Sequence, residues 1–381
     1  MKPRKILIVT GSRGEYGYIR PILKLIDQDE MLDYTLVVTN MHLLPNFGNT
    51  IDEIKRDNFR IDYMPVMTLA GFSQTSMMKS LCVFGFSIVD ILEKERPDFL
   101  LLAGDRGEQF IAAMSAGHMN IPVAHIQAGE ISGNIDGLTR HALARFAHIH
   151  FAANEDAKNR LISYGEEPFR VFNVGAPQLD EFIQSSYTEK NELIKKYRID
   201  IHRPLVLIMQ HPVTEEFTLA ETQMAETLKA ISELELQSIL IFPNSDAGSS
   251  GVQEAIQQYK RPFIHVCRSL SRQDFAGLMA FADVIVGNSS AGLLEAPSFE
   301  LPAVNIGRRQ QGRVQGKNVL NCGHDVKEII KTLQKALSPE FRRTLINMEN
   351  PYGDGKSSLR IIETLKTIAI NDKLIIKQLT Y

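Results

Sequence analysis

Two short polar segments early in the chain carry side chains that could transfer a proton or hold an anion. Asp105 and Arg106 stand together in GDRGE, which places a carboxylate beside a guanidinium. Such a pair can accept a proton next to a fixed positive charge, or it can be an internal ion pair that caps a helix. The segment GSRGEYG carries Arg13, which could contact a phosphate or a base edge, although a plain strand-to-helix turn would use the same glycines.

The densest polar segment is HIQAGEISGNIDGLTRH, which runs from His125 to His141. A structural loop seldom gathers so many titratable groups after an apolar run, so we expect this loop to line a functional site. Its candidate residues are Gln127, Glu130, Asp136 and His141. The histidines lack HExxH or similar spacing, and we expect no metal ion.

The second half of the chain adds a histidine and an asparagine directly after apolar runs. His211, in MQHPVTEE, could transfer protons near neutral pH or stabilise a departing phosphate oxygen, although a single histidine is more often structural. Asn244, in FPNSDAGS, could contact a ligand or form a turn.

The segment GNSSAGLLEAPSFELPAVNIGRRQQGR carries the pattern expected of a diphosphate site. Ser289 and Ser290 take the position of a helix N-cap, where hydroxyls, free N–H groups and the helix dipole can hold phosphate. Glu295 lies about one and a half turns further along the same expected helix and could accept both hydroxyls of a ribose. Arg309 and Arg313 follow the next apolar run and could add positive charge. Helix capping alone would explain Ser289 and Ser290, but it would not explain why Glu295 and then two arginines follow them.

These segments follow short apolar runs that alternate with stretches of helical periodicity, which is the pattern of βαβ units and parallel sheets. The expected strands are 5–10, 34–39, 99–104, 122–127, 148–153, 204–209, 238–243, 263–267, 283–287 and 302–307. They predict an α/β protein with two doubly wound domains, joined near residues 180–203. Ligands bind beyond the carboxyl ends of such strands, where the polar segments lie.

Composition restricts the partners and the location of the protein. The chain has 381 residues, and its 42 Lys and Arg against 45 Asp and Glu give a net charge of -3. We therefore expect no nucleic-acid or membrane partner. Cys82, Cys267 and Cys322 are widely spaced, as in a reducing compartment. The sequence lacks a signal-peptide pattern and any run near the roughly 20 apolar residues of a membrane helix, so we expect a cytoplasmic protein.

Seven motifs in one order resemble those of the hydrolysing UDP-N-acetylglucosamine 2-epimerases. They are GSRGEYG, MHLLPNFGNT, GDRGE, HIQAGEISGNIDGLTRH, QHPVTEE, FPNSDAGS and GNSSAGLLEAPS, and the resemblance runs from Lys5 to about Arg360. It implies two Rossmann-like domains in the glycosyltransferase-B arrangement, residues 1–185 and 200–355, with the active site in the cleft between them. A C-terminal helix at about 356–381 would return to the first domain. The resemblance also implies a UDP-sugar substrate, no cofactor and a homodimer or homotetramer.

The reaction implied by the resemblance is anti elimination of UDP across carbons 1 and 2, which gives a 2-acetamidoglucal. Hydration then leaves the manno configuration, and the N-acetylmannosamine enters sialic acid or related nonulosonic acid synthesis. By motif position, Asp105 and Asp136 become the acid/base carboxylates and His211 assists departure of the phosphate. UDP would be held by Arg13, Ser289, Ser290, Glu295 and Arg309, and the cleft would be lined by His42, Arg106, His141 and Asn244.

Gln127 departs from the family pattern, which often has Glu at this position, because an amide cannot act as a general base. Either Glu130 substitutes, or Gln127 only positions the substrate, or the change accompanies a modified sugar. The modified sugar would be UDP-N,N'-diacetylbacillosamine, the 6-deoxy, 4-acetamido relative used for legionaminic acid. We expect UDP-N-acetylglucosamine as the substrate. The alternatives are this modified sugar, a non-hydrolysing epimerase, a glycosyltransferase of the same fold and an inactive UDP-binding protein.

Overall fold

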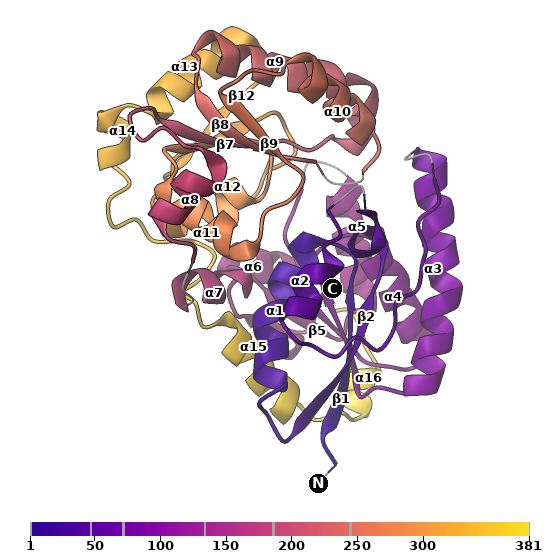
Figure 1. The fold of residues 1–381 in the computed structure, drawn as a ribbon. Coiled ribbons are helices and arrows are strands. Elements are labelled where there is room, and N and C mark those ends of the chain that lie inside the picture. Colours follow the sequence, from indigo (N-terminus) through magenta and orange to yellow (C-terminus); the bar gives the residue numbers. More distant parts are fainter. Residues whose placement is uncertain are drawn as a thin grey trace.

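Two parallel six-stranded sheets organise the chain (Figure 1). The computed structural model describes residues 2–45, 48–70, 73–132, 135–184, 187–243 and 246–380. The strand orders are β2-β1-β3-β4-β5-β6 and β12-β11-β10-β7-β8-β9. The predicted pair of doubly wound α/β sheets is therefore confirmed. We call the first sheet with its helices the N-terminal domain and the second the C-terminal domain. The expected domain bounds, 1–185 and 200–355, stay a prediction.

Ten of the twelve strands in the described residues lie where the sequence predicts them. They are β1 (Arg4–Thr10), β2 (Leu32–Val38), β3 (Phe99–Ala103), β4 (Val123–Ile126), β5 (Ile149–Ala152), β7 (Leu205–Met209), β8 (Gln237–Ile241), β9 (Ile264–Cys267), β10 (Val284–Gly287) and β11 (Ala303–Ile306). The sequence analysis missed β6 (Val171–Asn173) and β12 (Val319–Cys322). Both are short edge strands with partly exposed residues, so neither has a continuous apolar run.

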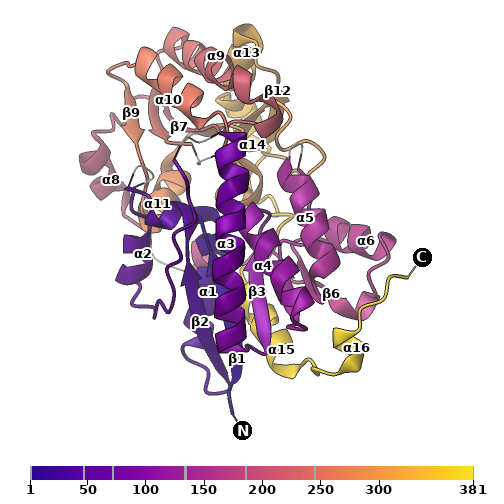
Figure 2. The same ribbon diagram turned by 90° about the vertical axis from the view of Figure 1, so that its right-hand side faces the viewer.

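Helices cover both faces of each sheet (Figures 1 and 2). In chain order they are α1 (Arg13–Ile26), η1 (Asn40–Leu43), α2 (Ile51–Arg56), α3 (Gln74–Glu95), α4 (Gly107–His118), α5 (Ile135–Phe146), α6 (Glu155–Ser163), η3 (Pro168–Arg170), α7 (Gln178–Gln184), α8 (Lys190–Tyr197), η4 (Thr214–Leu219), α9 (Ala220–Glu233), α10 (Ser249–Gln258), α11 (Arg272–Phe281), α12 (Ala291–Leu294), η5 (Ala296–Phe299), α13 (Val326–Ala336), α14 (Pro339–Arg343), α15 (Ser357–Thr367) and α16 (Asp372–Ile375). In β1, Ile6 and Ile8 join the core on the α1 side, while Leu7 and Val9 join the core on the α3 and α4 side. Successive side chains of a strand point to opposite faces, which explains this division.

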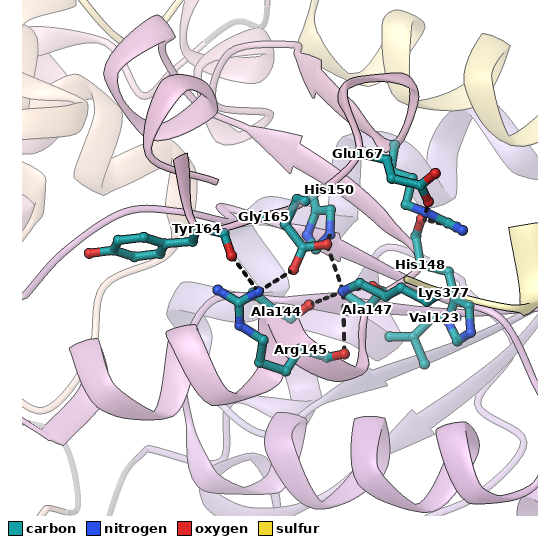
Figure 3. A network of polar contacts seen from close by, with 12 residues as sticks. Val123, Ala144, Arg145, Ala147, His148, His150, Tyr164, Gly165, Glu167 and Lys377 are labelled. Carbon is teal, nitrogen blue, oxygen red and sulfur yellow. Dashed lines mark hydrogen bonds and ion pairs between the residues drawn. The ribbon is translucent and has the colours of Figure 1, made fainter. Parts of the chain in front are cut away.

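The C-terminal segment packs on the N-terminal domain, as the yellow helices in Figure 1 show. Ile361 and Leu365 of α15 are fully buried in the core that contains Ile6 of β1. Lys377, near the end of the chain, donates to the carbonyl oxygens of Ala144 at 2.8 Å and Ala147 at 2.7 Å (Figure 3). These carbonyls end α5, whose dipole favours a cation there.

Helix α3 has an apolar outer face. Among the described helices it is the one that is long and apolar enough, by length and composition alone, to cross a membrane. The expectation that no segment approaches that length is therefore wrong for α3. Phe84 and Ile88 are fully buried against the first sheet, whereas Phe86 is 80% exposed. Figure 2 shows the helix along the outside of the N-terminal domain. The cytoplasmic location stays a prediction.

Each sheet has one point where its winding reverses. In the first sheet this point lies between β1 and β3, and in the second between β7 and β10. The loops that leave such neighbouring strands part to opposite faces, and ligands bind in the crevice between them. Arg13, Asp105, His211 and Ser289 all follow these four strands within a few residues.

Candidate active site

A cavity of about 260 Å³ lies between the two domains. The N-terminal domain contributes the loops after β1 and β3 and the first turn of α5, and the C-terminal domain contributes the loops after β7, β10 and β11. Nine predicted site residues line it, namely Arg13, Asp105, Arg106, Asp136, His211, Ser289, Ser290, Glu295 and Arg309. The structure therefore gathers residues that are up to 296 positions apart in the sequence, from Arg13 to Arg309.

A capping box fixes the loop after β1. The backbone N–H of Glu15 donates to Ser12 Oγ at 3.4 Å, and Glu15 Oε2 accepts from the backbone N–H of Gly11 at 2.5 Å and of Ser12 at 3.1 Å. These bonds hold Arg13 in the first turn of α1, at the cavity wall. Glu15 also lines the cavity, and burial together with the charge of Glu108 raises its pKa well above the usual value. The sequence analysis missed Glu15, although Ser12 followed three residues later by Glu is a capping-box signal.

Asp105 and Arg106 follow β3, and the ion pairs of each side chain are with other residues. Asp105 contacts the guanidinium of Arg140, on α5. Burial would raise the pKa of Asp105, but the positive charges of Arg140, Arg313, Arg309 and Arg106 hold it below the usual value. Asp105 is therefore an ionised carboxylate at the cavity wall.

Arg106 connects the two domains. Its Nη1 lies 3.1 Å from Asp246 Oδ1, in the loop after β8, and its Nε lies 3.3 Å from Glu108 Oε1. Asp246 is buried, so the pair is shielded from water. The guanidinium is thus held in a fixed direction at the edge of the cavity.

His211 is held between the ends of β7 and β10. Its backbone N–H donates to Asn288 Oδ1 at 2.7 Å, and Asn288 Nδ2 donates back to the His211 carbonyl at 2.8 Å. Burial, followed by the positive charges of Arg309, Arg13 and Arg106, lowers the pKa of His211 well below its usual value. The imidazole is therefore neutral near pH 7.

The serine segment departs from the expected single helix. Ser290 is the N-cap of α12, but its side chain makes no capping bond, and α12 ends at Leu294. Glu295 is the C-cap of α12, and its N–H donates to the carbonyl of Ala291. The 3-10 helix η5 follows from Ala296, because Pro297 lacks an N–H and disfavours a continued α-helix. The helix that Ser290 opens is therefore shorter than expected and ends at its C-cap, Glu295. Glu295 still lines the cavity, and its buried Oε2 has no hydrogen-bond partner among the described residues.

His42 and His141 do not line this cavity. The ring of His42 is buried between the hydroxyls of Thr10, 2.9 Å from Nε2, and Thr50, 2.8 Å from Nδ1. Burial lowers the pKa of His42 to about 3, so it is a neutral support behind the β1 loop. His141 packs edge-on against Tyr164, with ring centroids 5.5 Å apart. Asn244 lies outside the described residues.

Gln127, Glu130 and Arg313 are buried but do not line the cavity. Glu130 Oε2 and Arg313 Nε are 3.4 Å apart, and this buried pair joins the two domains. Asn154 Nδ2 also donates to Glu130, at 2.5 Å. Gln127 is buried with a backbone φ of 64°, and neither atom of its amide has a hydrogen-bond partner among the described residues. A left-handed conformation of a residue other than glycine costs roughly 1 kcal/mol or more, and it is often found near functional sites.

Arg272 is a further cavity residue that the sequence analysis missed. It opens α11 behind the N-cap Ser271, and its Nε lies 2.6 Å from Glu181 Oε2. The sequence does contain a signal for Arg272, because it follows the expected strand 263–267 and the helix-capping residue Ser271. Ser289 was identified by the same kind of position after a strand. Together with Arg13, Arg106 and Arg309, Arg272 gives the cavity wall four guanidinium groups, which lie among the five carboxyl groups of Glu15, Glu53, Asp105, Asp136 and Glu295. The guanidinium groups can bind the phosphates of a ligand, and the carboxyl groups can accept its hydroxyls or transfer its protons. In the part of the chain that the structure describes, no group of three or more His, Cys, Asp or Glu could hold a metal ion.

Known proteins with similar sequences and structures include UDP-sugar 2-epimerases. A family model described as UDP-N-acetylglucosamine 2-epimerase matches residues 24–366. The chain is 39% identical to the hydrolysing UDP-N,N'-diacetylbacillosamine 2-epimerase of Legionella pneumophila, over 98% of both chains. It is 32% identical to a UDP-N-acetylglucosamine 2-epimerase of Neisseria meningitidis serogroup B, over 88% of both chains. The crystal structure of UDP-GlcNAc 2-epimerase from Neisseria meningitidis bound to UDP-GlcNAc has a TM-score of 0.80 and 22% identity, covering 95% of this chain and 99% of that one.

Proposed function

The chain belongs to the UDP-N-acetylglucosamine 2-epimerase family and is a hydrolysing UDP-sugar 2-epimerase, and we propose that its substrate is UDP-N,N'-diacetylbacillosamine. The observation that carries this proposal is the cavity, where two carboxylates face a group of arginines and serines from the other domain. The 39% identity to a relative named for the diacetamido sugar, against 32% to one named for UDP-N-acetylglucosamine, favours the alternative that the sequence analysis placed second.

UDP binds to the C-terminal side of the cavity in this proposal. Ser289, Ser290 and Arg309 contact the diphosphate, because hydroxyl donors and a guanidinium match its oxygen atoms. Glu295 accepts both hydroxyls of the ribose. Its unpartnered Oε2 supports this role, since a buried carboxylate oxygen without a donor is unfavourable.

Asp105 and Asp136 carry the proton transfers. Asp105, as the ionised carboxylate, takes the proton from carbon 2; the C2–H electrons form the C1–C2 double bond, and the C1–O bond breaks to release UDP. Water then adds its oxygen to carbon 1, and carbon 2 receives a proton on the opposite face. Inversion requires a second acid/base group on that face, and Asp136 takes this role. The balanced reaction is UDP-sugar plus water to UDP plus the free 2-epimer.

His211 responds to the charge of the ligand. Without ligand, burial and the surrounding arginines keep its pKa well below the usual value. A bound diphosphate brings negative charge to the same arginines and raises the pKa of His211. The protonated ring then donates to the departing phosphate oxygen.

The substrate is tested by comparing two nucleotide sugars. The purified protein, without added metal or acceptor, is given UDP-N,N'-diacetylbacillosamine or UDP-N-acetylglucosamine, and released UDP is followed over time. We expect the higher kcat/KM with the diacetamido sugar. A higher value with UDP-N-acetylglucosamine would overturn the substrate, and UDP release that requires an acceptor would indicate a glycosyltransferase. The product, a 2,4-diacetamido sugar of manno configuration, would enter legionaminic acid synthesis.

We also propose that the protein is a homodimer joined by the outer face of α3. Lys79 and Glu93 each lie seven residues from the exposed Phe86, on either side. When two copies of α3 pair antiparallel about Phe86, Lys79 therefore meets the partner subunit's Glu93, and the apolar faces cover each other. Light scattering at micromolar concentration should show a dimer that Phe86→Asp converts to monomer. Met31→Asp, at another exposed apolar position, should leave the dimer intact. A monomeric wild type would contradict the proposal.

A further inference from the structure

A second cavity, of about 120 Å³, adjoins the active site, and we call it the side chamber. Its apolar lining residues are Met67, Leu69, Met77, Leu81 and Ile135, and its hydroxyl residues are Thr68, Ser76, Ser80, Thr139 and Thr214. The remaining lining residues are Gly107, Asn40, Arg106, Glu108, Asp136 and Asp246. Glu108 pairs with Asn40 and Arg106, and Arg106 pairs with Asp246, so most of these charges are held by each other. The chamber therefore combines an apolar surface with polar groups that have partners, which suits part of a small molecule.

The side chamber meets the active-site cavity at Arg106 and Asp136, which line both. None of Ser289, Ser290, Glu295 and Arg309, the proposed UDP ligands, lines the chamber. The chamber thus lies beyond the acid/base carboxylate Asp136, on the side away from the nucleotide.

Helix α3 forms one wall of the side chamber through a contact that depends on a glycine. A Cβ atom at Gly107 would lie 2.5 Å from Leu81 Cδ1. Because Gly107 has no Cβ, the side chain of Leu81 can lie directly over the loop that follows Arg106. An apolar surface is thereby brought next to the charged edge of the active site.

The orientation of the sugar determines which of its groups can enter the chamber. Carbon 1 carries the diphosphate and carbon 2 must face the acid/base carboxylates. Carbon 4 lies across the pyranose ring from carbon 1, and carbon 6 is bonded to carbon 5, the ring neighbour of carbon 4. The substituents at carbons 4 and 6 therefore point away from the nucleotide.

We infer that the side chamber receives the carbon 4 acetamido group and the carbon 6 methyl group of the substrate, and that it selects the 6-deoxy, 4-acetamido sugar. This inference rests on the proposed function. The two methyl groups lose contact with water against Met77 and Leu81, and the amide can bond to the threonine hydroxyls. A sugar with hydroxyls at carbons 4 and 6 gains less, because its polar groups would face methionine and leucine.

The adjacent residues Met77 and Met78 provide a matched test. Met77 lines the side chamber, whereas Met78 is 54% exposed and lines neither cavity. The kcat/KM for UDP-N,N'-diacetylbacillosamine and for UDP-N-acetylglucosamine is measured for wild type, Met77→Gln, Leu81→Gln and Met78→Gln. We expect Met77→Gln and Leu81→Gln each to lower the ratio of the two values by about 10-fold, and Met78→Gln to keep the wild-type ratio.

The two proposals fail in different ways. A wild type that prefers the diacetamido sugar, with an unchanged ratio in both chamber variants, overturns the role of the chamber and leaves the substrate standing. A wild type that releases no UDP from the diacetamido sugar overturns the proposed substrate itself. Both substrates are measured on one preparation, so partial unfolding of a variant does not alter the ratio.

Discussion

Asp136 Oδ2 lies 3.3 Å from Arg309 Nη2, and the two residues come from opposite domains. Asp136 is a proposed acid/base group, whereas Arg309 is a proposed ligand of the diphosphate. Both side chains are mostly buried, so solvent screens their pairing only in part. In the proposed function, a bound diphosphate competes with Asp136 for the same guanidinium. We therefore predict that binding of UDP is coupled to the freedom of the carboxylate to act on the sugar.

Arg309 and Arg308 allow this role to be tested with neighbouring residues. Arg309→Gln should lower kcat/KM by about 100-fold and weaken the binding of UDP, because a charge-assisted contact to phosphate is lost. Arg308 is 42% exposed in its side chain and pairs with Glu215 and Glu216 instead. Arg308→Gln should therefore stay within about twofold of wild type. Steady-state UDP release and calorimetric binding of UDP measure both effects, and equal losses in the two variants would contradict the assignment.

Replacing the proposed acid/base carboxylates should affect catalysis more than binding. Asp105→Asn and Asp136→Asn should each lower kcat by about 100-fold or more, since an amide cannot take or give the proton. The affinity for UDP, measured by calorimetry, should change much less. Retention of more than a tenth of wild-type kcat by either variant would exclude that residue as an essential proton carrier.

UDP binding should be accompanied by proton uptake on His211. The lowered pKa of His211 means that the free protein holds it neutral at pH 7, and the diphosphate raises this pKa. Calorimetry in two buffers with different ionisation enthalpies gives the number of protons taken up. That number should fall in His211→Ala. An identical number in wild type and variant would show that the ring does not respond to the ligand.

Buried neutral histidines should make the protein less stable in mild acid. Burial lowers the pKa of both His42 and His125 to about 3. Above pH 6.5, the usual histidine pKa, these residues are neutral in both the folded and the unfolded chain, and they cost no unfolding free energy. As the pH falls from 6.5 toward 3, the unfolded chain binds protons that the folded chain does not, so the free energy of unfolding decreases. At pH 5 each residue should cost about 2 kcal/mol of unfolding free energy. Urea denaturation at pH 7.5 and pH 5 measures the loss, and His42→Gln should reduce it. An equal loss in that variant would contradict the role of His42.

The parts of the fold that the sequence predicted are those with strong local signals. Strands buried on both faces, such as Ile6 to Val9, are continuous apolar runs, and parallel topology brings the residues after them to one edge. Edge strand β6 has no such run. The end of α12 at its C-cap Glu295 follows from Pro297, a signal in the sequence that the predicted helix did not take into account.

Side-chain direction could not be read from the sequence. His42 turns to Thr10 and Thr50 instead of the cavity, and this depends on two hydroxyls that only the folded chain brings together. The buried pair of Glu130 and Arg313 likewise forms between segments far apart in sequence. Motif position identifies the neighbourhood of such residues, and tertiary contacts decide which of them face the ligand.

The most direct test of the account is the reaction with UDP-N,N'-diacetylbacillosamine in deuterium oxide, without metal or acceptor, followed by proton and carbon NMR. The account predicts free UDP together with a free sugar of manno configuration that carries deuterium at carbon 2. A free sugar of unchanged configuration with hydrogen still at carbon 2 would contradict elimination and hydration, and carbon 2 inversion with UDP still attached would contradict hydrolysis.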